Sequence, residues 1–137
     1  MKTIVRIALL FVIGILILQS LGYGVGFFFD PAGGVGEFAS PPVDPEDELT
    51  IALVGLVGVG MLGTVAMLAL AVTLIVKANP AGTYIAMTIG AVYVLTGASA
   101  WRAGWTWDAS FYACAGALLM VLAIAHRWLE ARTAEPQ

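Results

Sequence analysis

The sequence predicts an all-α integral membrane protein, a four-helix bundle that occupies residues 1–137 as a single membrane domain. Three observations predict this class: the composition, four long uncharged stretches, and the turn-forming residues between them. The chain is 61% hydrophobic and 11% charged, with a mean hydropathy of +0.96. Soluble domains carry roughly 25% charged residues. A water-soluble fold of 137 residues could not bury this much apolar surface, so lipid is the expected solvent.

The uncharged stretches predict the helices. They hold 23 residues between Arg6 and Asp30, 28 between Glu48 and Lys77, 24 between Lys77 and Arg102, and 17 between Asp108 and His126. About 20 apolar residues cross a bilayer core as a helix, and a helix satisfies its own backbone hydrogen bonds in lipid. We therefore expect helices over about 4–23, 50–76, 81–102 and 109–128.

The connections support the same boundaries. A segment rich in Gly, Pro and acidic residues is predicted to form an extracytoplasmic loop over about 24–49, because prolines and glycines interrupt regular structure. Thr50 or Asp47 is suited to cap the helix that follows. Asn79 and Pro80 predict a tight turn, which makes the second and third helices antiparallel neighbours.

The distribution of basic residues predicts that both termini are cytoplasmic. Lys and Arg concentrate in the cytoplasmic loops of membrane proteins. With a cytoplasmic amino terminus, only Arg102 falls outside. The basic residues that then fall inside are Lys2, Arg6, Lys77, Arg127 and Arg132.

A cleaved signal peptide is the alternative for the first helix. Lys2 and Arg6, followed by the apolar stretch 7–18, also fit a secretory signal. The best cleavage site, Ser20-Leu21-Gly22, is a poor one. Removal of residues 1–22 would leave three helices, and we expect the helix to be retained.

Small residues predict how the helices pack. Lipid offers no hydrophobic reward for helix association, so close approach at small residues must supply the contact. Three faces at helical spacing carry such residues. They are Ala52, Gly55, Gly63, Ala66 and Thr73; Thr83, Ala86, Gly90, Gly97, Ala100 and Gly104; and Ala109, Ala113, Gly116 and Ala123. A homo-oligomer could use the same faces.

The composition argues against several function classes. Nine acidic and six basic residues without a basic run argue against nucleic-acid binding. One cysteine, Cys114, and one histidine, His126, provide neither a disulfide nor a metal cluster. Ionisable residues within the membrane are the usual mark of a transport path, and the helix centres have none. The sequence therefore predicts neither an enzyme nor a bound metal, and it makes a transporter or channel less favoured.

Two candidate sites remain. An outer-rim polar cluster of Asp30, Glu48, Arg102 and Asp108 is expected where the helices meet the extracytoplasmic surface. It either locks the loops through ion pairs or forms a polar rim over an apolar cleft. Within the membrane, the Tyr93 hydroxyl either bonds a neighbouring helix or donates to a quinone or a lipid carbonyl.

The chain resembles the small four-helix DoxX-like membrane proteins of bacteria, in the branch known only as a domain of unknown function. Three short motifs carry the resemblance. They are Phe27-Phe28-Phe29-Asp30-Pro31-Ala32-Gly33; Glu48 followed by Gly55 and Gly60; and Gly97, Arg102 and Asp108. The resemblance implies a four-helix fold in the bacterial inner membrane, and a link to subunits of quinone-dependent oxidoreductases.

These observations favour a multi-pass membrane protein without catalysis, acting as an accessory subunit or as a binder of lipophilic ligands. The alternative is a quinone-contacting subunit of a membrane oxidoreductase. Membrane lipids are the expected partners, together with a membrane complex or a second copy of the chain. No cofactor is expected, except quinone under the alternative.

Overall fold

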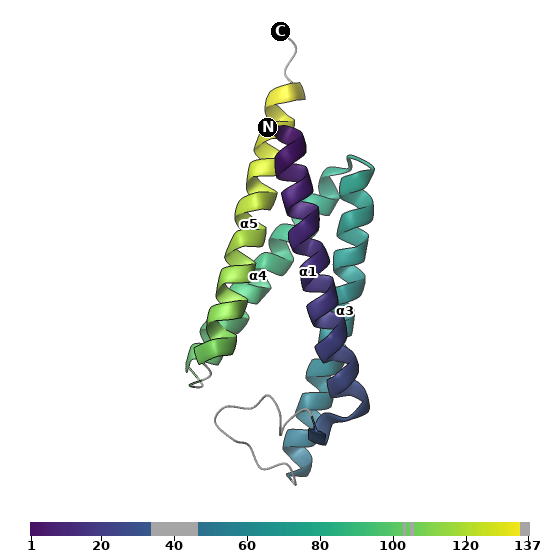
Figure 1. Ribbon diagram of the computed structural model, residues 1–137, viewed down its shortest axis with the longest axis vertical. Helices are drawn as coiled ribbons and strands as arrows, with labels where there is room; N and C mark the ends of the chain where they lie inside the picture. Colours follow the sequence, from purple (N-terminus) through teal and green to yellow (C-terminus); the bar gives the residue numbers. More distant parts are fainter. Residues whose placement is uncertain (34–46, 103, 105, 135–137) are drawn as a thin grey trace.

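The computed structural model describes residues 1–33, 47–102, 104 and 106–134, and the side chains of 1–33, 47–102, 104 and 109–132. Within these ranges the chain forms four long helices and no strand, as the sequence predicted. They are α1 (Lys2–Phe29), α3 (Glu48–Val76), α4 (Pro80–Arg102) and α5 (Thr106–Ala134). Successive helices run in opposite directions, so α1 begins and α5 ends at the same end of the bundle (Figure 1). We call this the terminal end and the other the opposite end.

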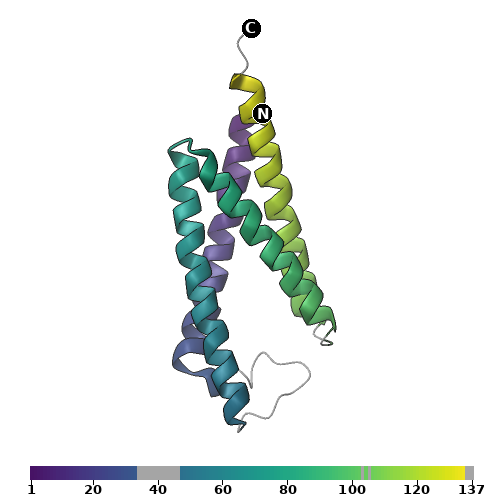
Figure 2. The same cartoon turned by 180° about the vertical axis from the view of Figure 1, so that it is seen from behind.

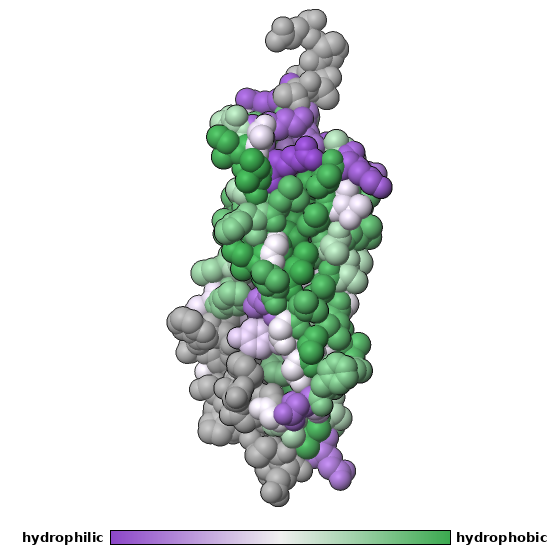
Figure 3. Space-filling view, turned by 45° about the vertical axis from the view of Figure 1, so that its right-hand side comes forward, coloured by the Kyte–Doolittle hydropathy of each residue, from purple (hydrophilic) through white to green (hydrophobic). Residues whose placement is uncertain are grey.

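All four helices are long and apolar enough to cross a membrane. The candidate spans are 28, 29, 23 and 24 residues long, and the last covers Ala109–Arg132. On the face seen in Figure 3, a hydrophobic belt separates hydrophilic side chains at the two ends. These features indicate a multi-pass membrane protein.

The first helix is longer than the sequence predicted. We expected it to end near residue 23, at the start of a glycine-rich loop, but it continues to Phe29. The glycines here serve packing, because a Cβ on Gly24 would lie 3.1 Å from the Met61 side chain on α3. A Cβ on Gly58 of α3 would lie 2.8 Å from the backbone nitrogen of Phe28. Close contact between the two helices stabilises a segment that its composition assigned to a loop.

Polar side chains cap two helices where the sequence predicted helix starts. Asp47 is the N-cap of α3, and its carboxylate accepts a hydrogen bond from the Thr50 backbone N–H at 3.0 Å. Donation by the Thr50 hydroxyl and backbone lowers the pKa of Asp47 below its ordinary value. The Asn79 side chain accepts from the Ala81 N–H at 2.9 Å. Ala78, with φ of 55°, completes the tight turn between α3 and α4.

The apolar core lies in the half of the bundle nearer the terminal end. The fully buried large side chains of α1 are Leu9, Ile13 and Leu16, all within its first fifteen residues. Those of the other helices come from the last part of α3, the first part of α4 and the last part of α5. They include Leu68, Ile75, Ala86, Leu119 and Ala123. Antiparallel order brings these segments to the same depth.

Toward the opposite end the helices separate into two pairs, α1 with α3 and α4 with α5 (Figures 1 and 2). Each pair stays in close contact. Gly58 holds α3 against α1, whereas a Cβ on Gly97 of α4 would lie 2.7 Å from the Ala109 carbonyl oxygen on α5. Gly82 connects the pairs near the terminal end, since its Cβ would lie 2.7 Å from the Ala71 carbonyl oxygen on α3. The bundle is therefore packed at one end and divided at the other.

The predicted small-residue faces are confirmed for α5 and, except at Gly104, for α4, and the one on α3 is wrong. Gly104 lies beyond the end of α4, is exposed and meets nothing within 4 Å. On α4 and α5, Gly90 and Gly116 face one another, and their added Cβ atoms would clash with backbone. On α3, by contrast, Gly63 would meet nothing within 4 Å, and the predicted face is largely exposed. This helix is apolar on every side, so its composition does not distinguish the inward face. The residues buried there are Gly58, Leu68, Ala71 and Ile75.

A pair of glycine substitutions tests this packing. We expect Gly116→Ala to lower the free energy of unfolding by about 1–3 kcal/mol, the usual effect of overpacking. Its Cβ would lie 2.5 Å from the Gly90 carbonyl oxygen. Gly63→Ala, which adds the same atom at an open position, should change it by less than about 0.5 kcal/mol. Denaturant unfolding in one detergent measures both, and equal effects would contradict the assigned α4–α5 contact.

Candidate functional site

The structure places the predicted outer-rim residues at the opposite end of the bundle but on separate helix pairs. Asp30 follows α1, and its carboxylate accepts a hydrogen bond from the Gly33 N–H at 3.0 Å. Glu48 is the first residue of α3 and Arg102 is the last of α4, and both are exposed. The Asp108 side chain lies outside the described residues. Among those that are described, Asp30, Glu48 and Arg102 form no ion pair with one another. The four-residue cluster stays a prediction.

Four hydroxyl groups at membrane depth are satisfied within their own helix. Four threonine side chains donate to the carbonyl oxygen four residues earlier, at 2.9–3.0 Å. They are Thr64, Thr73, Thr88 and Thr96. This local bond is the usual arrangement for hydroxyls in membrane helices, and it leaves these side chains without a distinct role.

Tyr93 forms a different contact, a buried hydrogen bond between helices. Its hydroxyl lies 2.6 Å from the Ser20 hydroxyl on α1. Ser20 is 1% exposed and Tyr93 is 7% exposed. Of the two predicted roles for Tyr93, the bond to a neighbouring helix is therefore present, with a serine as partner. This bond connects α1 to α4 and so joins the two helix pairs.

The surroundings of this bond have unused hydrogen-bonding capacity. Two hydroxyls supply two O–H donors, and the bond between them uses one. Gln19, the residue before Ser20, has a buried side-chain oxygen with no partner in the described part of the chain. The Tyr112 ring of α5 lies against the Tyr93 ring, with centroids 5.5 Å apart. We call Gln19, Ser20, Tyr93 and Tyr112 the mid-membrane polar group.

The mid-membrane polar group lies where the packed core ends. On α1, Ser20 follows the last buried apolar side chain of the core, Leu16, by one helical turn. Beyond it the helix pairs diverge toward the opposite end (Figures 1 and 2). An unsatisfied buried acceptor is unfavourable by roughly 1–3 kcal/mol. Because such an acceptor, the Gln19 oxygen, occurs at the boundary of the core, the mid-membrane polar group is the strongest candidate for binding a ligand.

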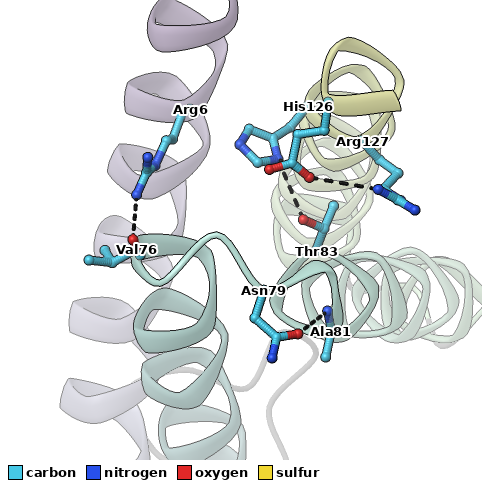
Figure 4. Close-up of polar contacts among 8 residues, drawn as sticks. Arg6, Val76, Asn79, Ala81, Thr83, His126 and Arg127 are labelled. Atoms are coloured by element: carbon cyan, nitrogen blue, oxygen red, sulfur yellow. Dashed lines mark hydrogen bonds and ion pairs between the residues drawn. The ribbon is translucent and has the colours of Figure 1, made fainter. Parts of the chain in front are cut away.

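A second polar group surrounds His126 near the terminal end. The His126 side chain is 2% exposed, and its Nδ1 lies 3.5 Å from the Thr83 hydroxyl on α4 and 3.8 Å from the Glu130 carboxylate. Its Nε2 is buried and has no partner in the described part of the chain. Nearby, the Arg6 guanidinium donates to the Val76 carbonyl oxygen at 2.8 Å and closes the end of α3 (Figure 4).

Sequence reasoning missed the burial of His126. It considered the residue only as a possible metal ligand. The signal was present, however, because His126 continues the spacing of buried residues on α5, after Leu119 and Ala123. A histidine in line with a packed face is expected to point inward, whatever its distance from the helix end.

Comparisons with protein-family models, curated proteins and solved structures find no match to this chain. The resemblance to DoxX-like proteins therefore stays a prediction.

A double-mutant cycle tests the bond between α1 and α4. We expect Ser20→Ala and Tyr93→Phe each to reduce the free energy of unfolding by about 1 kcal/mol. The double variant should lose less than the sum, with a coupling of about 0.6–1.7 kcal/mol, the range for interhelical hydrogen bonds in membranes. Unfolding in mixed detergent micelles measures all four forms. Full additivity would show that the two hydroxyls do not interact.

Proposed function

We propose that this protein is a non-enzymatic lipophilic-ligand binder of the bacterial inner membrane, and that the mid-membrane polar group holds a hydroxyl group of the ligand. Two observations carry the proposal: the buried oxygen of Gln19, which has no partner among the described residues, and the hydrogen bond that the following residue, Ser20, forms with Tyr93. Buried polar groups in lipid are normally satisfied. A ligand that forms the missing hydrogen bonds would bind favourably, because it would satisfy polar atoms that otherwise have no partner.

The hydrogen-bonding inventory favours a hydroxyl as the bound group. A hydroxyl donates one hydrogen bond and accepts others. The hydroxyl of the ligand would donate a hydrogen bond to the Gln19 oxygen. It would accept a second hydrogen bond from the O–H that the Ser20–Tyr93 bond leaves unused. An ester or quinone carbonyl, which only accepts, would leave the Gln19 oxygen unsatisfied. The rest of the ligand would be apolar, because the exposed sides of α1 and α4 in this part of the bundle carry Leu21, Val25 and Leu95.

A quinone-contacting subunit of a membrane oxidoreductase is the second candidate. The reduced form of a quinone carries hydroxyl groups of the required kind, and the paired Tyr93 and Tyr112 rings offer an aromatic contact at 5.5 Å between centroids. Aromatic rings favour such edge-to-face neighbours. In this case the chain would act as an accessory subunit that binds quinol beside a redox partner.

Ligand binding is tested with a short-chain quinol, its dimethyl ether and a short-chain diacylglycerol, each titrated by native mass spectrometry. We expect the quinol, the diacylglycerol or both to bind with one-to-one stoichiometry. The ether, which lacks O–H donors, should bind about tenfold more weakly than the quinol, the effect of roughly one net hydrogen bond. Gln19→Leu and Tyr93→Phe should weaken binding by a similar factor.

Tyr84→Phe is the matched control, since it removes the same atom from an exposed tyrosine on the same helix. It should leave binding unchanged. Binding of neither hydroxylated probe, or equal affinity for quinol and ether, would contradict the proposal. Binding of quinol alone would favour the oxidoreductase subunit, and the same spectra would show any protein partner or second copy that remains attached.

We also propose that both termini face the cytoplasm and that α1 is retained in the mature protein. The positive-inside rule supports the orientation, because the basic residues Lys2, Arg6, Lys77, Arg127 and Arg132 all lie at the terminal end. Burial of Leu9, Ile13 and Leu16 supports retention. Cleavage after residue 22 would remove these side chains from the core and expose their apolar neighbours.

Reporter fusions test the orientation. A green fluorescent protein fused after Gln137 should be fluorescent, and alkaline phosphatase fused there should be inactive, because the first folds only in the cytoplasm and the second only outside it. The intact mass should be close to 14.3 kDa, the mass of residues 1–137. Phosphatase activity would overturn the orientation, and a mass lacking residues 1–22 would overturn retention.

A further inference from the structure

We infer that the terminal end contains a binding site for the phosphate of an anionic phospholipid, formed between α1 and α5 by Arg6, Lys2 and the Nε2 atom of His126. The inference is independent of the mid-membrane polar group. It starts from the side chain of His126, which is 2% exposed and whose Nε2 has no partner in the described part of the chain.

The His126 ring is oriented to offer this nitrogen to α1. It projects from α5 on the side that faces α1 and Arg6, whereas Arg127 projects to the other side (Figure 4). Its Nδ1 is occupied by the Thr83 hydroxyl at 3.5 Å and the Glu130 carboxylate at 3.8 Å. When Nδ1 accepts a hydrogen bond from the Thr83 hydroxyl, the ring proton resides on Nε2. Nε2 is then a buried donor that lacks an acceptor.

The charges around this nitrogen favour an anion. Arg6 lies on the side of His126 that faces α1 (Figure 4), and Lys2 lies about one helical turn earlier on α1. Glu130 lies on the Nδ1 side of the ring and 3.9 Å from Arg127. Arg6 uses one N–H to hold the Val76 carbonyl, and a guanidinium has five N–H donors in a planar fork that suits phosphate. A phosphate between α1 and α5 would meet Arg6, Lys2 and the Nε2 donor.

The position favours a lipid as the source of the phosphate. The site lies at the terminal end, where hydrophilic side chains border the hydrophobic belt (Figure 3), the level at which phospholipid headgroups are found. Just inside it, exposed apolar side chains line both helices, Ile7 and Phe11 on α1 and Val121 and Ile124 on α5. Acyl chains could lie along these side chains while the headgroup binds above them. Basic residues near an anionic leaflet attract its lipids in this way.

Binding is tested by titrating the full chain with phosphatidylglycerol and with phosphatidylcholine in native mass spectrometry. The readout is the ratio of the two dissociation constants, in which a general loss of stability cancels. The wild type should prefer phosphatidylglycerol. Arg6→Gln should reduce the preference about fivefold, the effect of losing roughly one net hydrogen bond to the phosphate. His126→Phe, which leaves the formal charge unchanged, should reduce it similarly.

Two controls separate the site from general attraction. Arg132→Gln removes one charge at the same end, from a side chain stacked on Trp128 at 3.6 Å, and should leave the preference unchanged. His126→Gln, which keeps an N–H donor, should retain most of it. An equal loss in Arg132→Gln, or an unchanged preference in both Arg6→Gln and His126→Phe, would overturn the site. If inorganic phosphate stabilised the protein against heat as much as phosphatidylglycerol does, a lipid would not be the source of the phosphate.

Discussion

The structure depends on one constraint: in lipid, a polar group must find its hydrogen-bond partner within the protein or in a bound molecule. This constraint makes the backbone helical over all four spans. It turns the threonine side chains back onto their own helices. It joins Ser20 to Tyr93 between α1 and α4. Against this background, the two buried atoms without a partner among the described residues, Gln19 Oε1 and His126 Nε2, are informative.

Packing explains why these atoms occur where they do. Close helix contacts need small residues, and glycines supply them within each pair, at Gly58 for α1–α3 and at Gly90 and Gly116 for α4–α5. Contact between the pairs depends on Gly82 and on the larger core side chains, most of which lie in the terminal half. The core therefore has two boundaries. The mid-membrane polar group lies at one and the His126 group at the other.

The fold class could be predicted from the sequence because charge placement and segment length are strong constraints in a membrane protein. The start of α3 and the turn into α4 could be predicted from Asp47, Asn79 and Pro80, whose side chains act on the adjacent backbone. The end of α1 could not be predicted, because Gly24 is interpreted as a helix breaker unless its contact with Met61 is known. The inward face of α3 was predicted wrongly for a related reason. When a helix is apolar on every side, its sequence does not distinguish the face toward lipid from the face toward the core. The unpartnered oxygen of Gln19 depends on its tertiary surroundings, which no spacing encodes.

The first helix is the element that both polar groups share. Gln19 and Ser20 belong to one of them, and Lys2 and Arg6 to the other. Between these positions, Leu9, Ile13 and Leu16 fill the core. A ligand at either boundary would bridge α1 to the α4–α5 pair and strengthen a junction that the glycine contacts reinforce only at Gly82 among the described residues. The energetic effect of such a ligand would therefore fall on the association of the two helix pairs, which is the least tightly packed junction of the bundle.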